Sequence, residues 1–543
     1  MFKKIKQFFN SLTGGMTYSN VSPKMKRGTS ILLTILFAVI FYFFTLPPLN
    51  IHSKDTWIFL IVVFAFFNIV SGRRFPYLKI RILTLVGLIV LFGLLNMTSI
   101  ELFTSKKYAN VIQIQDGNFA EDIEELPIEK IPTLDRDSSE KVGSRKMGEL
   151  LDLVSQFNID NMYTQINYKD KPVRVTPLEY NGILKYLFNF TKGLPGYMTI
   201  DIVDGSSELI QLQEGIKYSK DDLLFRNITL YTRVKYPFEI FDRMEFEIDE
   251  EGIPYWIIPT YKNRVGFFGA MDVKNVILVN AVTGETSKYP VEEVPTWVDR
   301  VYNAERVIEQ LDWYGKYQLG YLNSKFAQKQ VLQTTEGYNY LALDDDIYMY
   351  TGFTSVAGDE SNVGFILSNL RTKETKFYPI SSAKEISAME SAKGAVQEKR
   401  YQSTFPLLLN IKQKPTYFLS LKDDAGLIKQ YAFVDAQDYQ KVSVANSVEE
   451  AYERHTGTLI EDDEFDENTE FSDMTGIVNS IETVVVNGNT HYYFTIKGNE
   501  AIYVSSIQLS ERLPFVKAGD EVSFKFAKTN INKVISFESI ATN

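Results

Sequence analysis

Three long apolar runs stand close together near the start of the chain. They cover roughly residues 29–46, 56–72 and 82–100, and none of them contains a charged side chain. A helix of about 20 uncharged residues can cross a bilayer, whereas a helix on the surface of a soluble protein keeps a polar face. The pattern therefore predicts three membrane-spanning helices, which form an anchor over residues 29–100.

The short segments around these runs differ in positive charge. Six Lys or Arg residues precede the first run, whereas the loop after it contains only Lys54, next to Asp55. Four more follow the second run, and we call them the topology anchors: Arg73, Arg74, Lys79 and Arg81. Because Lys and Arg stay on the cytoplasmic side, the chain is predicted to begin inside and to place residues 101–543 outside. A patch that binds anionic lipid headgroups is the alternative for these charges.

The basic tail, residues 1–28, has a pattern of its own. Phe2, Ile5, Phe9 and Leu12 recur at spacings of three, four and three, with lysines away from that stripe. This pattern is typical of a short helix that lies on a membrane surface. A disordered basic tail is the alternative, because so short a helix is marginal in water.

After the anchor, the chain becomes polar and acidic. Residues 101–145 include a charged segment with several prolines, which we interpret as an extracellular stalk. An amphipathic helix is predicted to begin near Lys146, because Met147, Leu150 and Leu151 fall on one broad face. Strand-like runs separated by turns follow it.

Two of these strand-rich segments are copies of each other. Residues 276–294 and 365–383 align without a gap at an offset of 89 and share five residues within nine positions. Weaker copies occur at residues 198–212 and 431–445. Each copy is a pair of strand-like runs joined by a turn, and three of them precede a helical pattern. We therefore predict four α+β units, in which a helix covers an antiparallel sheet. The first unit is assigned to residues 146–250, the second to 251–335, and the third and fourth together to 336–460.

The turn of the second unit carries a resemblance to a known family. Its sequence VNAVTGE, residues 279–285, resembles the PepSY class of exported domains, in which a strand ending V-(D/N)-x-x-T-G-E turns back on itself. The third unit departs from this pattern, because Lys373 stands where the second unit has Gly284. The resemblance implies binding or restraint of exported peptidases, or another role in the cell envelope. An ordinary hairpin turn favours the same residue types.

A second acidic run, residues 461–473, is predicted to be a linker to a last module, residues 474–543. This module has five strand-like runs with an interruption after the third, and it resembles an OB-type small β-barrel. Barrels of this type often bind single-stranded nucleic acid on aromatic faces. A candidate binding face is therefore formed by Tyr492, Phe494 and Tyr503. Packing inside the barrel is the alternative for these aromatic residues.

Charge and composition exclude several classes of function. The net charge is −11, and residues 1–100 carry eleven Lys or Arg against one Asp, so the remaining 443 residues carry −21. An acidic body repels phosphate backbones, which argues against a nucleic-acid partner. The chain has no cysteine, so it has no thiol nucleophile, thiolate metal site or disulfide.

No catalytic or metal-binding motif stands out from the sequence. His52, His455 and His491 have no partner at the spacing of a metal site. Two acidic clusters, Asp344–Asp346 and Asp423–Asp424, could form the paired acids of a glycan-cleaving site, but exposed turns explain them as well. We therefore predict no catalytic residue, metal or cofactor.

Together these patterns predict a membrane-anchored α+β protein with three transmembrane helices, repeated sheet-and-helix units and a C-terminal barrel. The predicted function is that of a non-enzymatic protein of the bacterial cytoplasmic membrane and cell envelope. Its outer part would bind an exported or membrane protein, such as a peptidase or a secretion component. The alternative is an envelope hydrolase that uses acidic residues to cleave glycan or peptide.

Overall fold

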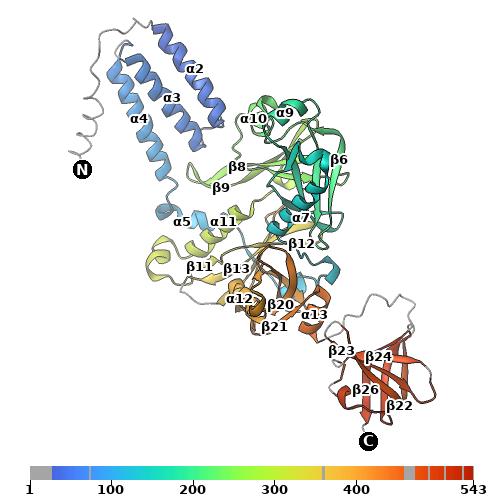
Figure 1. Cartoon of the computed structure of the whole chain (residues 1–543). Helices are drawn as coiled ribbons and strands as arrows, with labels where there is room; N and C mark the ends of the chain where they lie inside the picture. The colour runs from blue at the N-terminus through green and yellow to red at the C-terminus, as the bar shows by residue number, and fades with distance from the viewer. Residues whose placement is uncertain are drawn as a thin grey trace.

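The computed structural model describes residues 27–72, 75–356, 361–457, 471–486, 489–499, 501–506, 509–510, 512–528 and 531–541 (Figure 1). Three long helices come first, a body of several sheets follows, and a small barrel ends the chain. The predicted tail helix, most of the acidic linker and the topology anchors Arg73 and Arg74 lie outside the described residues.

Three helices match the predicted membrane spans. They are α2 (Arg27–Thr45), α3 (Lys54–Ser71) and α4 (Leu78–Met97), and each is long and apolar enough to cross a membrane. Helices α2 and α3 pack through aromatic rings, with the centroids of Phe37 and Phe66 4.0 Å apart. Many of their other apolar side chains face outward, as expected for helices that lipid surrounds.

The segment expected to be a stalk, residues 101–145, packs against the body instead. It contains α5 (Glu101–Ala109), strand β1 (Gln115–Asp116), α6 (Phe119–Asp122) and the start of α7. Strand β1 pairs in parallel with a strand of the body. Several of its apolar residues are buried, among them Tyr108, Ile112, Phe119, Ile123 and Ile131, whereas Leu102 and Phe103 stay exposed. The interpretation as a stalk was wrong, because a largely polar segment needs only a few well-placed apolar side chains to pack.

The body also contacts the anchor directly. The backbone N–H of Leu49, in the loop between α2 and α3, donates to the Pro237 carbonyl at 2.6 Å. The Asn263 side chain donates to the His52 carbonyl at 2.8 Å, and the Phe267 N–H donates to Thr98 Oγ1 at 2.9 Å. The α2–α3 loop and the residues after α4 therefore lie at the same end of the three helices, next to the body.

Four antiparallel sheets form the body, and the first two follow α7 and α10 along the chain. The first unit consists of α7 (Arg136–Glu149), α8 (Leu151–Val154), β2 (Phe157–Ile159), β3 (Thr164–Tyr168), β4 (Lys171–Tyr180), α9 (Ile183–Asn189), β5 (Leu194–Asp201) and β6 (Ser207–Ile216). The second consists of η3 (Leu224–Arg226), α10 (Ile228–Lys235), β7 (Glu245–Ile248), β8 (Pro254–Val265), β9 (Gly269–Asn280) and β10 (Thr286–Pro290). Helix α7 begins ten residues before the predicted start at Lys146, because the Asp135 side chain caps it by accepting from the Ser138 N–H.

The other two sheets follow α11 and α12 in the same way. The third unit consists of α11 (Ala304–Tyr317), β11 (Leu332–Thr334), β12 (Asn339–Leu343), β13 (Asp346–Ser355), β14 (Ser361–Asn369) and β15 (Thr375–Tyr378). The fourth consists of α12 (Glu385–Ala395), β17 (Gln402–Ser403), β18 (Leu407–Ile411), β19 (Lys414–Lys422), β20 (Ile428–Asp435) and β21 (Val442–Ala445). Strand β16 (Ser382–Ala383) pairs with β14, and α13 (Val448–Thr456) follows the fourth sheet.

The same hairpin turn occurs in all four units. Its first residue is Asn or Asp, and its side-chain oxygen accepts from the N–H groups two and three residues ahead. In the second unit Asn280 accepts from Val282 and Thr283, both at 2.9 Å. In the others the residue is Asp201, Asn369 or Asp435. The two weak copies in the sequence are therefore structural copies too.

The turn residues Gly284 and Lys373 occupy equivalent positions in the second and third units. Both have a left-handed backbone, with φ of 76° and 68° respectively. Glycine adopts this conformation without strain, whereas lysine does not. The Lys373 ammonium lies 2.7 Å from the Asp272 carboxylate of the second unit, so the lysine links two units.

The residue after the Asn or Asp that begins each turn closes its unit. It is buried, and its carbonyl accepts from the segment that enters the preceding helix. Tyr302, just before α11, donates to Leu370 at 2.7 Å, and Ala383, just before α12, donates to Ala436 at 2.8 Å. The corresponding acceptors in the first two units are Ile202 and Ala281. Each unit therefore begins with its helix, whereas the predicted boundaries at 251 and 336 placed the helix after the strands.

Neighbouring sheets share their cores. In β9, Ile277 and Val279 pack in a core with residues of the first unit. Val276 and Leu278, which alternate with them along the strand, pack in another core with residues of the third unit. Successive side chains of a strand point to opposite faces, so a continuous apolar run marks a strand that is buried on both sides. The units therefore form a stack.

The last module is a closed five-stranded barrel, as the spacing of the strands predicted. Its strands follow the order β22-β23-β24-β26-β25, in which β24 and β26 pair in parallel and the other neighbours pair antiparallel. They are β22 (Phe471–Val486), β23 (Asn489–Ile496), β24 (Ile502–Ser506), β25 (Glu521–Ala527) and β26 (Asn532–Ala541).

The repeated turn predicts the effect of a substitution at Asn280. We expect Asn280→Ala to lower the free energy of unfolding by about 1–2 kcal/mol, because two backbone N–H groups lose their acceptor. Asn280→Asp, which keeps an acceptor oxygen, is expected to stay close to the wild type. Thermal unfolding of the detergent-solubilised protein measures both. Equal unfolding of the alanine variant and the wild type would show that the side chain does not hold the turn.

Candidate functional site

A cavity of about 490 Å³ lies where the four units meet, and its walls carry charges of both signs. The first unit contributes Asp135, Gln165 and Arg174, and the second contributes Arg243 and Glu245. The third contributes Asn303, Glu305, Tyr338 and Tyr340, the segment before α11 contributes Arg300, and the fourth contributes Phe405. A site that depends on all four units can form only in the complete stack.

Arg174 brings a buried positive charge to this cavity. It lies in β4 and is 5% exposed. Its guanidinium donates to the Leu134 carbonyl at 2.8 Å, to Ser139 Oγ at 2.8 Å and to Gln165 Oε1 at 3.0 Å. Burial lowers its pKa to about 10, so the group remains a cation at neutral pH. The groups to which Arg174 hydrogen-bonds in the described part of the chain are neutral, and the nearby Asp135 carboxylate favours its charged form, so an anionic ligand group would meet Arg174 beside Asp135.

Arg300 is the second buried cation of the wall. Its guanidinium lies 4.0 Å from the centre of the Tyr340 ring, and it donates to the Tyr340 hydroxyl at 2.6 Å. Stacking on an aromatic ring and a hydrogen bond together fix the orientation of the planar group. The Nε atom of Arg300 has no hydrogen-bond partner among the described residues.

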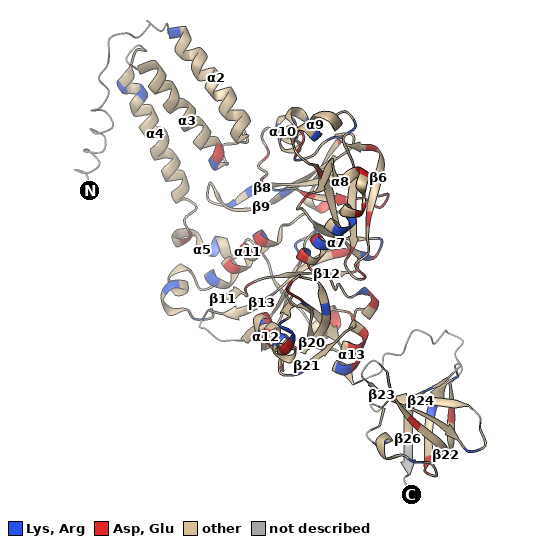
Figure 2. Ribbon diagram, in the orientation of Figure 1, with Lys and Arg blue, Asp and Glu red and all other residues tan. Residues whose placement is uncertain are grey.

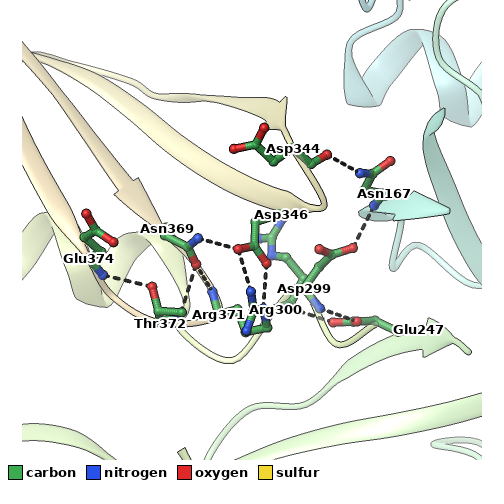
Figure 3. A network of polar contacts seen from close by, with 10 residues as sticks. All are labelled: Asn167, Glu247, Asp299, Arg300, Asp344, Asp346, Asn369, Arg371, Thr372 and Glu374. Carbon is green, nitrogen blue, oxygen red and sulfur yellow. Dashed lines mark hydrogen bonds and ion pairs between the residues drawn. The ribbon is translucent and has the colours of Figure 1, made fainter. Parts of the chain in front are cut away.

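Two buried carboxyl groups lie behind Arg300 (Figure 3). Glu247 accepts from the backbone N–H groups of Asp299 and Arg300, both at 2.9 Å. Asp299 in turn accepts from the Asn167 N–H at 2.7 Å. Burial raises the pKa of Glu247 to about 8, and burial together with the nearby Glu247 raises the pKa of Asp299 well above its ordinary value. The pair ties the first three units together, and neither carboxyl is among the residues that line the cavity.

The acidic cluster Asp344–Asp346 continues this network. The Asp344 carbonyl accepts from the Asn167 side chain at 2.9 Å, in a tight turn. Asp346 forms a two-point ion pair with Arg371. The Arg371 Nε donates to Asp346 Oδ1 at 2.6 Å, and its Nη2 donates to Oδ2 at 2.7 Å. Asn369, the turn residue of the third unit, also donates to it at 2.7 Å. Asp346 is therefore a structural ion-pair partner and not an unpaired acid, as Figure 3 shows.

The other acidic cluster, Asp423–Asp424, lies in a turn. Asp423 accepts from the Leu427 N–H at 2.9 Å and lies 3.5 Å from the Lys429 ammonium. The explanation by turns fits this cluster, and the arrangement supplies no second acid across a cleft.

An ion pair stands at the rim of the cavity. Arg243 of the second unit bonds to Glu305 of α11, which also accepts from the Tyr338 hydroxyl at 3.1 Å. Although partial burial opposes it, the bond from Arg243 holds the pKa of Glu305 below its ordinary value. Both side chains are about half exposed, so this pair can open to a ligand at little cost in stability.

The candidate binding face on the barrel was wrong. Tyr492, Phe494 and Tyr503 are only 7%, 2% and 1% exposed, and all three point into the barrel. The rings of Phe494 and Tyr503 stack there with centroids 5.7 Å apart. The alternation of strand residues is the reason, because every second residue of β23 faces inward together with Ile496.

Two of the four topology anchors can be placed. Lys79 is exposed at the start of α4. Arg81 donates to the Gly72 carbonyl at 2.6 Å and lies 5.5 Å from the centre of the Phe67 ring. This arginine holds the turn between α3 and α4, which a count of positive charges does not reveal.

The described part of the chain has no group of three or more His, Asp or Glu side chains placed to hold a metal ion. His52 lies beside Phe267 near the anchor, His455 lies beside Phe433 in the fourth unit, and His491 is in the barrel. The three histidines are thus in separate parts of the molecule.

Comparisons with known proteins give no family. No protein-family model matches the chain, and no curated protein is significantly similar to it. Among solved structures, a mutant levansucrase from B. megaterium is 10% identical, covers 79% of this chain and 98% of its own, and has a TM-score of 0.19. Similarity at that TM-score carries no argument about fold or activity.

The raised pKa of Asp299 predicts a pH-dependent effect. The folded protein keeps a proton that the unfolded chain releases above the ordinary value of 3.8. The free energy of unfolding of the wild type should therefore fall as the pH rises from about 4 toward the folded-state pKa, by about 1.4 kcal/mol for each unit that separates the two pKa values.

We expect Asp299→Asn, which does not titrate, to reduce this fall, and Glu247, whose pKa is also raised, to account for the remainder. The stability of the variant relative to the wild type should then increase as the pH rises above about 4, as measured by thermal unfolding. Asp137→Asn, at an exposed acid of the cavity mouth, is the control. If the free energy of unfolding of Asp299→Asn differs from that of the wild type by the same amount at every pH, the Asp299 carboxyl is already ionised in the folded protein over this range.

The ion pair of Asp346 predicts a large effect on stability. Arg371→Met leaves the mostly buried carboxylate without its counter-charge and should lower the free energy of unfolding by about 3–5 kcal/mol, as measured in urea. Asp344→Asn, which keeps the backbone carbonyl that Asn167 contacts, is the matched control and should change it little. A small effect of Arg371→Met would show that water reaches Asp346.

Proposed function

We propose that the protein is a non-enzymatic component of the bacterial cell envelope that binds an exported or membrane protein. Three helices anchor it in the cytoplasmic membrane, the basic N-terminus lies inside, and the stacked units and the barrel lie outside. The distribution of Lys and Arg supports this orientation. The contact of the α2–α3 loop with the body supports it too, because the loop with the fewest positive charges is at the same end as the body.

The cavity among the four units is the observation that carries the proposal. Its cations Arg174 and Arg300 are deep, and its acids are Asp135, Asp137, Glu245 and Glu305, the last of them at the rim beside Arg243. Groups of both signs at fixed positions suit a polar segment of a partner protein, which carries charges of both signs as well. Because hydrogen bonds already orient the two buried arginines, binding would cost little side-chain ordering.

The positions of the acids favour binding over catalysis. A general acid or base must reach the reacting atoms. Glu247 and Asp299 have raised pKa values but do not line the cavity, and Asp346 is engaged with Arg371. Of the acids that line the cavity, Glu305 and Asp135 have lowered pKa values, because Arg243 and Lys422 bond to them against the effect of burial, so both stay ionised and are unsuited to donate a proton.

Two further resemblances agree with an envelope role. The hairpin turn at Asn280 recurs in each unit, which fits repeated PepSY-like domains. The strand order of the last module and its single parallel pair, β24 with β26, fit an OB-type barrel. With Tyr492, Phe494 and Tyr503 inside, such a barrel would offer its outer surface for docking.

Photo-cross-linking in intact cells tests the proposal. A benzophenone amino acid replaces Asn161, an exposed residue that lines the cavity. The same amino acid replaces Tyr439 as the control, because Tyr439 is exposed but does not line the cavity. We expect one exported or membrane protein to be attached at Asn161 and to be absent at Tyr439, as identified by mass spectrometry of the purified adduct.

A charge reversal at the rim sharpens the test. Arg243→Glu should reduce the yield of the Asn161 adduct several-fold, because it changes the charge that a partner meets. Lys288→Glu breaks an ion pair with Glu239 that is not part of the cavity and should leave the yield unchanged. Equal labelling at Asn161 and Tyr439, or an adduct that contains only wall glycan, would contradict the proposal and favour the hydrolase.

A further inference from the structure

Two neighbouring segments of the body expose large apolar side chains to an unusual degree. On α9, Leu184, Leu187 and Phe188 lie three and four positions apart, so they share one face of the helix, and they are 64%, 54% and 78% exposed. On and beside η3, Leu224 and Phe225 are 72% and 61% exposed. Soluble surfaces seldom gather apolar residues of this size, so something is expected to cover them.

The two segments form one surface, which we call the apolar patch: α9, Phe190 and residues 223–225. The Arg226 guanidinium donates to the Phe190 carbonyl, and its centre lies 5.8 Å from the centre of the Phe190 ring. The Tyr186 hydroxyl accepts from the Leu223 N–H at 3.4 Å. Tyr186 itself is buried against Tyr180, so the opposite side of α9 is fixed to the first sheet.

This patch continues into the contact between body and anchor. Helix α10 begins two residues after η3, and the Pro237 and Phe238 carbonyls just beyond it accept from Leu49 and from the Asn50 side chain. Those two residues are in the loop that joins α2 to α3. Three further apolar side chains are exposed at this contact: Phe238 of the body, and Leu49 and Ile51 of the loop. Figure 1 shows α9 and α10 at the end of the body nearest to α2 and α3.

Charge around the patch supports the same arrangement. Helix α9 has a single charged residue, Lys185, and the nearby cations Lys192 and Arg226 flank the patch, as does the exposed acid Asp221. Figure 2 shows that α9 and α10 carry few charges on the side of the anchor. Long basic side chains at the border of an apolar surface can reach lipid headgroups while their stems lie on apolar groups.

From this geometry we infer that the apolar patch inserts into the outer surface of the same bilayer that α2, α3 and α4 cross. The inference rests on the proposed membrane anchor, because those helices set the position of the bilayer. A lipid surface is favoured over a partner protein because the patch is continuous with the ends of the spanning helices and therefore lies at the height of the headgroups. The body would then rest on the membrane through the patch as well as through its anchor.

Fluorescent labelling tests this inference in the full-length protein. The chain has no cysteine, so one introduced cysteine is its only thiol. Leu187→Cys in the patch is labelled with an environment-sensitive fluorophore and reconstituted, with no other protein, into phosphatidylcholine–phosphatidylglycerol vesicles that carry a quencher on the acyl chains. Ile386→Cys, on α12 and similarly exposed at 47%, is the matched control in the body. Ile89→Cys in the middle of α4 reports on the anchor.

We expect strong quenching at positions 89 and 187 and little quenching at position 386. Quenching at 89 but not at 187 would overturn the inference and leave the anchor in place. A blue-shifted but unquenched label at 187 would also overturn it, because a second copy of the chain would then be covering the patch. Absence of quenching at 89 would instead contradict the membrane anchor itself.

Discussion

Burial of the strands on both faces is the constraint on which the body depends. Each sheet between two others must supply apolar side chains in both directions, as Val276 and Ile277 do in β9. A single unit cannot satisfy this requirement, since one apolar face would remain in water. Stability must then come largely from the contacts between units, as in other stacked repeats. The unit-closing bonds to Ile202, Ala281, Leu370 and Ala436 hold each hairpin at the position from which it can contact the next sheet.

The polar network is possible only because the stack is otherwise apolar and well ordered. Taking a charge out of water is costly unless each group finds partners. Asp346 meets Arg371 at two points, which offsets most of that cost, whereas Glu247 accepts two backbone N–H groups and avoids the cost by keeping its proton near neutral pH, as its raised pKa shows. Arg174 is different, because its partners are neutral. A buried cation with this environment is more useful for attracting an anionic group than for stabilising the fold, which is why the cavity is the candidate site.

The sequence was informative where one local pattern was enough. The apolar runs predicted the three helices, and the shared turn around Thr283 and Thr372 predicted the repeat, including its two weak copies. It failed where the outcome depended on contacts with distant residues. Tyr492 and Phe494 alternate correctly, but alternation alone does not say which face is inside. The cavity was missed because Arg174 and Arg300 are 126 positions apart and no local pattern connects them. A charged residue within an otherwise buried strand, as in KPVRVTP, was the available signal.

The contacts between anchor and body determine how the cavity can be reached. A flexible stalk would let the body turn freely, and a partner would have to find the cavity in any orientation. Instead, Pro237, Asn263 and Phe267 bond to residues next to three different helix ends, which restricts rotation about any one of them. The cavity is thereby held in one orientation relative to the helices. A partner that is itself in the membrane would then lose less orientational freedom on binding than a freely diffusing one, so the rigid connection favours partners that share the bilayer.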